Sequence, residues 1–312
     1  MKVLLHYRAG PGLAQRLATL PGIDLSVVSD TDEAAFTAAL PQADAIWHVL
    51  RPLTATDIAA APRLRLIQKI GVGVNTIDLE AARARGIAVC NLPGTNARAV
   101  AELALLLMLG ALRRVTHFDA ATRAGKGWAQ PPALQDSLFE LGGRTVGLVG
   151  YGAIPALLAP VLAALGCRLL YTSTAPKPEA EGSYRTLAGL LAESDVVSLH
   201  IPETPQTRGL IDAGAIARMK RGAVLVNTAR GGLVDQAALV AALRSGHLGA
   251  AGLDVFAQEP VDPADPLFSL PNVVVTPHVA WMTTGTFDRS FAIAAENVRR
   301  LAAGEALLHR VA

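Results

Sequence analysis

The sequence has little cysteine, little surplus charge and no long apolar run. Only two of its 312 residues are cysteines, Cys90 and Cys167. Their spacing fits no metal site. So few cysteines also argue against a disulfide-built secreted domain and favour a reducing cytoplasm. The formal net charge is only +2, without a run of Lys and Arg, so we expect no nucleic acid as a partner.

The longest apolar stretch, Leu103–Leu112, is flanked by Glu102 and Arg113. A bilayer span needs about 20 apolar residues, so this stretch is too short to be one. The residues up to Tyr7 lack the long apolar core and cleavage site of a signal peptide. We therefore expect no membrane partner and interpret the apolar stretch as a buried helix.

Strand-like apolar runs alternate with helical stretches along the chain, which predicts parallel sheets covered by helices on both faces. The predicted strands of the first series are Val3–Tyr7, Leu25–Ser29, Ala45–Val49, Leu66–Ile70 and Ile87–Cys90. A second series of six, the number in a full dinucleotide-binding sheet, comprises Val146–Val149, Arg168–Thr172, Val196–His200, Ala223–Asn227, Gly249–Val255 and Val273–Thr276.

The length of 312 residues predicts two domains. A long helical pattern from Ala97 to Arg114 and a loop at Gly125–Pro132 separate the two strand series. A last helical pattern covers about Thr284 to Ala303. The fold class predicted is therefore α/β, with two doubly wound parallel-sheet domains, the second of them a Rossmann cofactor domain.

A glycine-rich segment, Gly150–Pro155, follows a predicted strand and opens a helical run. Its first glycine permits a tight turn, and its second lets a cofactor pyrophosphate approach the N–H groups of the helix start. The third glycine of the pattern is replaced by Pro155, which the first turn of a helix tolerates. A strand–helix turn without a cofactor is the alternative. The predicted pyrophosphate contacts are Gly150, Gly152, Ala153 and Ile154.

The second strand of this series is not followed by the acid that would hold the ribose hydroxyls of NAD. Ser173 occupies its place, with Thr174 beside it and Lys177 nearby. Without a carboxylate to repel it, a 2′-phosphate can bind hydroxyls and a lysine. We therefore favour NADP over NAD as the cofactor, with Lys177 as an ordinary surface residue as the alternative.

Three chemically active side chains follow the last three predicted strands: Arg230, Glu259 and His278. Ligands of open α/β sheets bind beyond the carboxyl ends of the strands. Reduction of a 2-keto acid needs a cation for the carboxylate, which Arg230 offers, and a proton donor for the carbonyl oxygen, which His278 offers. Glu259 would fix the orientation of His278. Taken alone, each of these residues is more often a surface, loop or packed residue, and it is their joint placement after successive strands that favours the catalytic interpretation.

Together with Lys69–Asp78, Pro93–Asn96 and Val100–Glu102, these segments resemble the D-isomer-specific 2-hydroxyacid dehydrogenase family over nearly the whole chain. The resemblance implies that Arg230 binds substrate and that His278 donates the proton with Glu259 as its partner. It also implies that Val72 and Gly73 bind the substrate carboxylate through their backbone N–H groups.

The resemblance further implies a flavodoxin-like substrate domain built from both chain ends, residues 1–97 plus 283–312. The dinucleotide-binding domain would cover residues 98–282, and a homodimer is the usual assembly. For His200 packing at a strand end is the stronger alternative. Further cofactor contacts implied are Val100, His200, Ile201, Pro202, Thr207, Thr228, Ala229, Arg230, Asp254 and His278. No metal is expected.

Departures from the family pattern bear on the substrate. Many relatives carry an arginine and a small residue near His48 and Val49, so His48 and Leu50 are candidates to touch substrate. Trp281 resembles the glyoxylate and hydroxypyruvate reductase branch and also the transcriptional corepressor branch. Its bulky indole would narrow the pocket and favour a short substrate.

The sequence therefore predicts NADP- or NAD-dependent reduction of a small 2-keto acid, of the glyoxylate or hydroxypyruvate type, to the D-2-hydroxy acid. One alternative is an NAD-linked dehydrogenase of a larger or phosphorylated substrate, such as 3-phosphoglycerate. The other is a dinucleotide-sensing interaction protein related to the corepressors.

Overall fold

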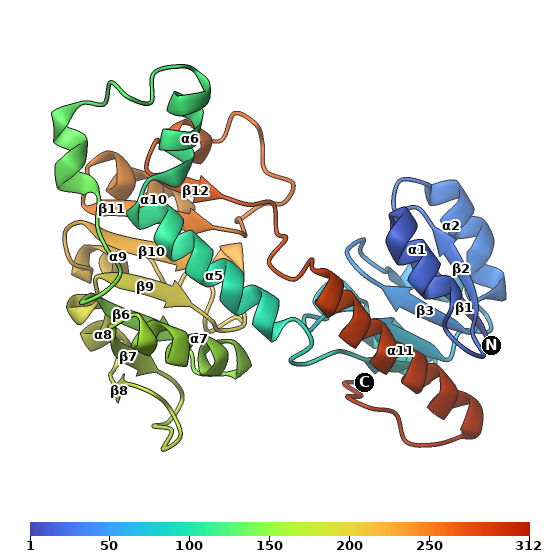
Figure 1. Ribbon diagram of the computed structural model, residues 1–312. Helices are drawn as coiled ribbons and strands as arrows, with labels where there is room; N and C mark the ends of the chain where they lie inside the picture. Colours follow the sequence, from blue (N-terminus) through green and yellow to red (C-terminus); the bar gives the residue numbers. More distant parts are fainter. The chain divides into compact units, whose positions relative to one another are not determined.

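The computed structural model describes all residues, 1–312, and divides into two compact α/β units (Figure 1). Unit 1 comprises Met1–Asn96 and Thr283–Ala312, and unit 2 comprises Ala97–Met282. Each unit contains one parallel sheet, of five strands in unit 1 and seven in unit 2. The predicted fold class, two doubly wound parallel-sheet units, is confirmed.

The sheet of unit 1 has the strand order β2-β1-β3-β4-β5, the doubly wound flavodoxin-like order. Its strands are β1 (Lys2–His6), β2 (Asp24–Val28), β3 (Ala45–His48), β4 (Leu66–Lys69) and β5 (Ala88–Cys90). All residues of β3, β4 and β5 are buried, so these strands show no alternation of apolar and exposed polar residues, and their few polar side chains, His48, Gln68 and Lys69, are buried too. The helices of this unit are α1 (Pro11–Ala18), α2 (Glu33–Ala39), η1 (Leu40–Gln42), α3 (Ala55–Ala59), α4 (Leu79–Ala84) and α11 (Thr284–Ala303).

The C-terminal segment returns to unit 1 through α11, which Figure 1 shows beside the first strands. Asn297 on this helix donates to the Gln68 side chain on β4 at 2.7 Å, and both residues are buried. After α11 the chain runs antiparallel to β5, where the Val311 N–H donates to the Val89 carbonyl at 2.7 Å. The tail therefore covers an edge of the sheet that would otherwise expose unpaired backbone groups.

The sheet of unit 2 has the order β12-β11-β10-β9-β6-β7-β8. Counted from β6, this is the 3-2-1-4-5-6 order of a dinucleotide-binding sheet with β12 added at one edge. The strands are β6 (Thr145–Val149), β7 (Arg168–Thr172), β8 (Ser183–Tyr184), β9 (Val196–Leu199), β10 (Ala223–Asn227), β11 (Leu248–Leu253) and β12 (Val273–Val275). The helices are α5 (Ala97–Leu112), α6 (Val115–Arg123), η2 (Pro132–Ser137), α7 (Ala153–Ala164), α8 (Leu187–Glu193), α9 (Ala213–Arg218), η3 (Gly231–Leu233), α10 (Gln236–Arg244) and η4 (Pro266–Ser269).

Both faces of this sheet are covered by apolar side chains. Val224 and Val226 on β10 belong to one hydrophobic cluster, and Leu225 between them belongs to another. Successive side chains of a strand point to opposite faces, so the two clusters form a core on each side of the sheet.

The prediction of six strands in the second series was wrong by one. The additional strand, β8, is two residues long and pairs with β7 at the edge of the sheet. Both of its residues are exposed, so it carries no apolar pattern that the sequence could reveal. The predicted helix from Ala97 also ends earlier, at Leu112, because Arg114 takes a left-handed conformation with φ +48°.

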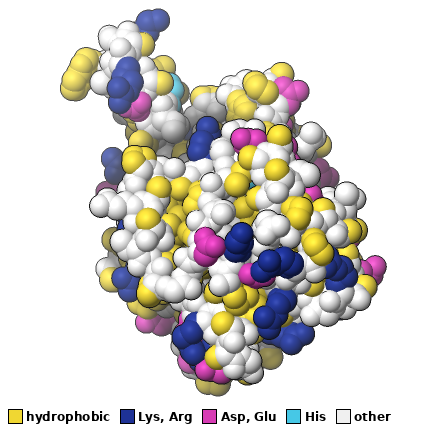
Figure 2. All heavy atoms as spheres, turned by 90° about the vertical axis from the view of Figure 1, so that its right-hand side faces the viewer, with side chains coloured by type: hydrophobic (Ala, Val, Ile, Leu, Met, Phe, Trp, Pro, Cys, Tyr) yellow, Lys and Arg dark blue, Asp and Glu magenta, His cyan; other side chains and the backbone are white.

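No helix combines the length and the apolar character that crossing a membrane requires. Figure 2 shows basic and acidic side chains together on one face. Ion pairs between such residues include Arg299 with Glu296 and Glu305.

Candidate active site

Glu259 and His278, predicted as partners, lie in contact beyond the ends of β11 and β12. Oε2 of Glu259 is 2.7 Å from Nδ1 of His278. Oε1 of the same carboxylate accepts from the Phe256 N–H at 2.9 Å. Both carboxylate oxygens are thus engaged, and the imidazole is held through Nδ1.

The environment of Glu259 keeps its side chain ionised. Burial would raise the pKa of this carboxyl group, but the hydrogen bonds from His278 and Phe256 and the positive charges of His278 and Arg230 lower it below its usual value. The carboxylate therefore acts as an acceptor for the imidazole at neutral pH.

The turn that carries His278 is organised by Asp254, at the end of β11. His278 takes a left-handed conformation with φ +56°, and its N–H donates to the Asp254 carbonyl at 2.7 Å. The Asp254 carboxylate is 0% exposed and accepts from the N–H groups of Val279 and Ala280, both at 2.9 Å, and from the Thr276 hydroxyl. The predicted contact of Asp254 with a nicotinamide stays a prediction, but the structure gives this carboxylate three protein donors.

Arg230 lies in the loop after β10, and Asn227 fixes the path of that loop. The Asn227 side chain donates to the Arg230 carbonyl at 2.8 Å and accepts from the Ala229 N–H at 3.0 Å. A Cβ atom on the next residue, Gly231, would lie 1.9 Å from the Phe256 carbonyl. Glycine at this position therefore lets the Arg230 loop pack directly against the loop that leads to Glu259.

The glycine loop after β6 has the geometry of an anion-binding turn. Gly150 has φ +95°, and a Cβ there would lie 2.7 Å from the His200 carbonyl, so only glycine fits. Gly152 precedes α7 and faces open space, since a Cβ atom added to it would meet no other atom within 4 Å. The first turn of α7 has no acidic residue and no side-chain cap, and the N–H groups that it offers to an anion are those of Ala153 and Ile154, since the buried Pro155 has none.

The loop after β7 contains the residues predicted to contact the adenosine ribose. The Ser173 hydroxyl donates to the Ala175 carbonyl within the loop, and Thr174 is exposed. The Lys177 side chain is 39% exposed, and its Nζ forms a long ion pair with Oε1 of Glu179, at 4.0 Å. The lysine ammonium is thus the cation that this loop presents to solvent.

Several other predicted cofactor contacts lie at the ends of β9 and β10. The ring nitrogens of His200 are buried without a partner, and burial lowers its pKa to about 4, so the ring is neutral. After Ile201, the Pro202 carbonyl accepts from the Thr207 hydroxyl at 2.8 Å. The Thr228 hydroxyl is buried without a partner. Ala229 is half-buried beside it, whereas Val100 is buried in α5.

The predicted substrate residues of unit 1 follow β3 and β4. Leu50 is 51% exposed, and Val72 is also exposed. The N–H groups of Val72 and Gly73 donate to no protein acceptor, while the Val72 carbonyl accepts from the Asn91 side chain at 2.9 Å. These N–H groups are therefore open to an anion.

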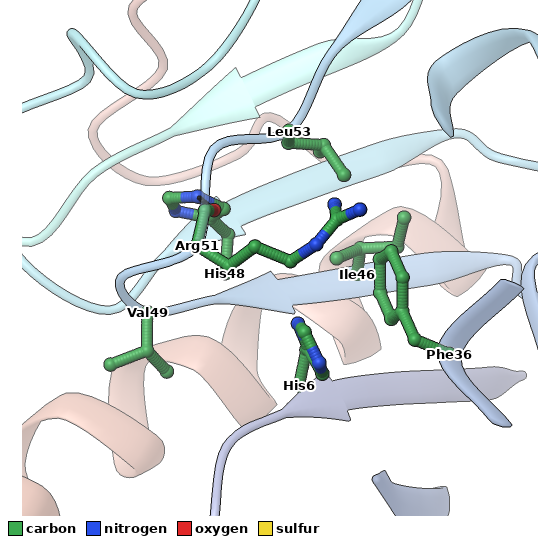
Figure 3. A pocket seen from close by; sticks show the side chains of 7 residues that line it. All are labelled: His6, Phe36, Ile46, His48, Val49, Arg51 and Leu53. Carbon is green, nitrogen blue, oxygen red and sulfur yellow. Dashed lines mark hydrogen bonds between the residues drawn. The ribbon is translucent and has the colours of Figure 1, made fainter. Parts of the chain in front are cut away.

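His48, by contrast, is buried and stabilises its own loop. Its Nε2 lies 2.6 Å from the Arg51 carbonyl and must donate to it, and its Nδ1 lies 3.4 Å from the Lys69 ammonium and must accept. Burial, followed by the Lys69 charge, lowers the His48 pKa to about 3, so the ring is not a proton donor at neutral pH. Figure 3 shows the ring in a small pocket lined by His6, Phe36, Ile46, His48, Val49, Arg51 and Leu53.

Trp281 contacts the residue predicted as proton donor. Its indole N–H donates to the His278 carbonyl at 3.1 Å. The indole thus helps to fix the backbone of the turn that carries His278.

Sequence reasoning missed the residues that position the site rather than form it. Asn227, Thr276 and Gly231 all act through hydrogen bonds or close packing between loops that are distant in sequence. The pair of glycines after Arg230 was the available signal, since a close backbone approach requires a missing side chain.

Comparison with known proteins places the chain in context. The sequence profile described as "D-isomer specific 2-hydroxyacid dehydrogenase, NAD binding domain" matches residues 105–280. The D-3-phosphoglycerate dehydrogenase of Mycobacterium leprae is 42% identical over 302 residues, which is 94% of this chain and 56% of that protein. The glyoxylate reductase of Aeropyrum pernix is 41% identical over 272 residues, which is 85% of this chain and 81% of that protein.

Among solved structures, the TT0316 protein from Thermus thermophilus superimposes with a TM-score of 0.91 at 39% identity, covering 100% of both chains. The chain spans about half the length of the phosphoglycerate dehydrogenases that it matches, namely 56% of the Mycobacterium leprae protein.

Proposed function

Because the chain belongs to the D-isomer-specific 2-hydroxyacid dehydrogenase family, we propose that it reduces a small 2-keto acid to the D-2-hydroxy acid. The contact between Glu259 and His278 carries this proposal, since it presents a held imidazole next to a guanidinium. In the reaction, the carbonyl carbon accepts a hydride and the carbonyl oxygen accepts a proton from Nε2 of His278.

Each unit, taken by itself, contains groups that are proposed to bind a substrate carboxylate. In unit 2, Arg230 has the planar fork that pairs with a carboxylate. In unit 1, the free N–H groups of Val72 and Gly73 suit an anion such as a carboxylate. His48, the last residue of β3, and Leu50, in the loop after this strand, are proposed as further substrate contacts.

The residues present fit a nicotinamide dinucleotide. The open space at Gly152 and the absence of acidic residues at the start of α7 suit a pyrophosphate. The buried Thr228 hydroxyl has no hydrogen-bond partner in the protein, so it can bond to a polar group of the cofactor. When bound, this cofactor supplies the hydride. The residues proposed to hold it are Val100, Gly150, Gly152, Ala153, Ile154, Ser173, Thr174, Lys177, His200, Ile201, Pro202, Thr207, Thr228, Ala229, Arg230, Asp254 and His278.

NADP is proposed over NAD. The loop after β7 offers Lys177 and the Thr174 hydroxyl and has no acid in the place of Ser173. The internal bond from Ser173 to Ala175 leaves Lys177 as the main donor for a 2′-phosphate.

A short substrate of the glyoxylate or hydroxypyruvate type is proposed, because the Trp281 indole is fixed on the His278 turn. A phosphorylated hydroxy acid is the second candidate, since relatives 42% identical bear the name D-3-phosphoglycerate dehydrogenase. A screen of NADPH and NADH oxidation with glyoxylate, hydroxypyruvate, pyruvate and 3-phosphohydroxypyruvate separates the two. Fast turnover of glyoxylate supports the first candidate, and turnover confined to the phosphorylated acid replaces it with the second. No turnover, despite cofactor binding, would favour a sensing protein.

We also propose a homodimer. Apolar side chains are exposed on neighbouring helices of unit 2, Leu106 and Leu109 on α5 and Leu157 and Val161 on α7, and Trp128 in the loop after α6 is 96% exposed. Patches of this kind mark protein interfaces. Light scattering should give twice the chain mass, and Leu106→Glu with Leu109→Glu should give the monomer mass.

Both cysteines are free thiols, in line with a proposed cytoplasmic location.

A further inference from the structure

One side chain fixes the loop after β7 from inside the core. The hydroxyl of Tyr171, on β7, accepts from the Lys177 N–H at 2.8 Å and donates to the Lys177 carbonyl at 3.1 Å. The Tyr171 ring is buried in one of the two cores of unit 2. Both backbone groups of Lys177 are thus bound to one rigid group that belongs to the sheet.

A second tyrosine holds the far end of the same loop. The hydroxyl of Tyr151, which lies between the two glycines of the dinucleotide turn, accepts from the Glu181 N–H at 2.8 Å. The rings of Tyr151 and Tyr171 are 4.9 Å apart. The turn that suits a pyrophosphate and the loop that presents Lys177 are therefore joined through two neighbouring aromatic side chains.

The remaining hydrogen bonds of this loop do not fix it to the sheet. Ser173 bonds to Ala175 inside the loop, and Ala180 N–H donates to the Lys177 carbonyl, which is itself held by Tyr171. Removal of the Tyr171 hydroxyl would therefore break both bonds between the Lys177 backbone and β7, while the far end of the loop stays held by Tyr151.

We propose that Tyr171 is a specificity-determining positioning residue, which places the Lys177 ammonium to bind the 2′-phosphate of the dinucleotide. This inference rests on the proposed NADP preference, and it assigns that preference to a residue that need not touch the cofactor. A lysine whose backbone is not fixed binds a phosphate more weakly, because binding then costs the conformational entropy of the loop as well as that of the side chain. NADH has no 2′-phosphate for Lys177 to bind, so the Tyr171 hydroxyl would affect the discrimination between the two nucleotides rather than their binding in general.

The experiment measures the dissociation constants of NADPH and NADH by nucleotide fluorescence for the wild type, Tyr171→Phe, Lys177→Ala and Tyr184→Phe. Tyr184 is the matched control, since its ring contacts Tyr171 at 5.7 Å but its hydroxyl makes no hydrogen bond. We expect Tyr171→Phe and Lys177→Ala each to weaken NADPH binding about tenfold, the effect of one charge-assisted hydrogen bond, and to leave NADH binding nearly unchanged. Tyr184→Phe should change neither constant.

Combining the two substitutions adds a test that a folding defect cannot imitate. The double variant should lose no more NADPH affinity than either single variant, because both act on one contact. Equal losses for both nucleotides, no loss in Tyr171→Phe, or no loss in Lys177→Ala would each overturn the inference. A wild type that prefers NADH would overturn it too, while turnover of glyoxylate with NADH would leave the proposed reaction standing.

Discussion

Nδ1 of His278 lies 2.7 Å from a carboxylate oxygen of Glu259, and the other oxygen of that carboxylate accepts from the Phe256 N–H. The carboxylate thus fixes the imidazole ring and is itself fixed by the backbone. Since its pKa is below the usual value, it keeps this role throughout the neutral range.

The first prediction concerns this pair. Glu259→Gln keeps the size of the side chain but removes its charge and turns one acceptor into a donor. We expect kcat for keto-acid reduction to fall about 10²-fold, at the lower end of the range for general acid catalysis, with NADPH affinity unchanged. Glu305→Gln, an exposed glutamate paired with Arg299, serves as the control. A kcat for Glu259→Gln equal to that of the control would contradict the role of the carboxylate.

The second prediction concerns Asp254, whose buried carboxylate accepts from Val279, Ala280 and Thr276. An asparagine side chain accepts hydrogen bonds only through its oxygen, because its other terminal group is an NH2 donor. Asp254→Asn therefore leaves at least one buried donor without an acceptor. Each such group costs about 1–3 kcal/mol, and we expect urea unfolding to show a loss of that size together with reduced turnover. Thr276→Val, which removes a single hydroxyl, should cost less. Full stability in Asp254→Asn would show that the carboxylate does not hold the turn.

The third prediction is a loss of stability in acid caused by His48. Its pKa is about 3 in the folded protein, against about 6.5 for an unfolded chain, so only the unfolded state gains a proton between these values. The stability contributed by the neutral ring is complete above about pH 6.5 and is lost as the pH falls toward 3. One such histidine accounts for about 2 kcal/mol between pH 7 and pH 5.

The free energy of unfolding of His48→Asn should therefore decline less steeply than that of the wild type as the pH falls from about 7 to about 5. The exposed His309, whose left-handed φ of +52° an asparagine also tolerates, supplies the control His309→Asn. If His48→Asn and the wild type decline with the same slope, the buried ring does not determine the acid sensitivity.

Much of the fold could be predicted because buried parallel strands, such as β10 with Leu225 at its centre, are continuous apolar runs. The short edge strand at Ser183–Tyr184 could not, since exposed pairs of residues carry no periodic pattern. Likewise, the positions of Glu259 and His278 after consecutive strands predicted their proximity, because parallel strands end at one edge of a sheet.

The positioning contacts could not be predicted in the same way. Whether the Tyr171 hydroxyl meets the backbone of Lys177, or a Gly231 side chain would collide with Phe256, depends on the path of loops in space. The sequence made His48 a candidate to touch substrate, whereas its ring nitrogens lie against the Arg51 carbonyl and the Lys69 ammonium. Residue type and spacing do not decide such contacts.

The most direct test of the proposed reaction is the rate of a single turnover, measured by the absorbance of NADPH after glyoxylate is mixed with enzyme already loaded with the nucleotide. His278→Ala should lower this rate by about 10²–10⁴-fold and leave the dissociation constant of NADPH near that of the wild type. A variant that oxidises NADPH at the wild-type rate would contradict the assignment of His278 as the proton donor.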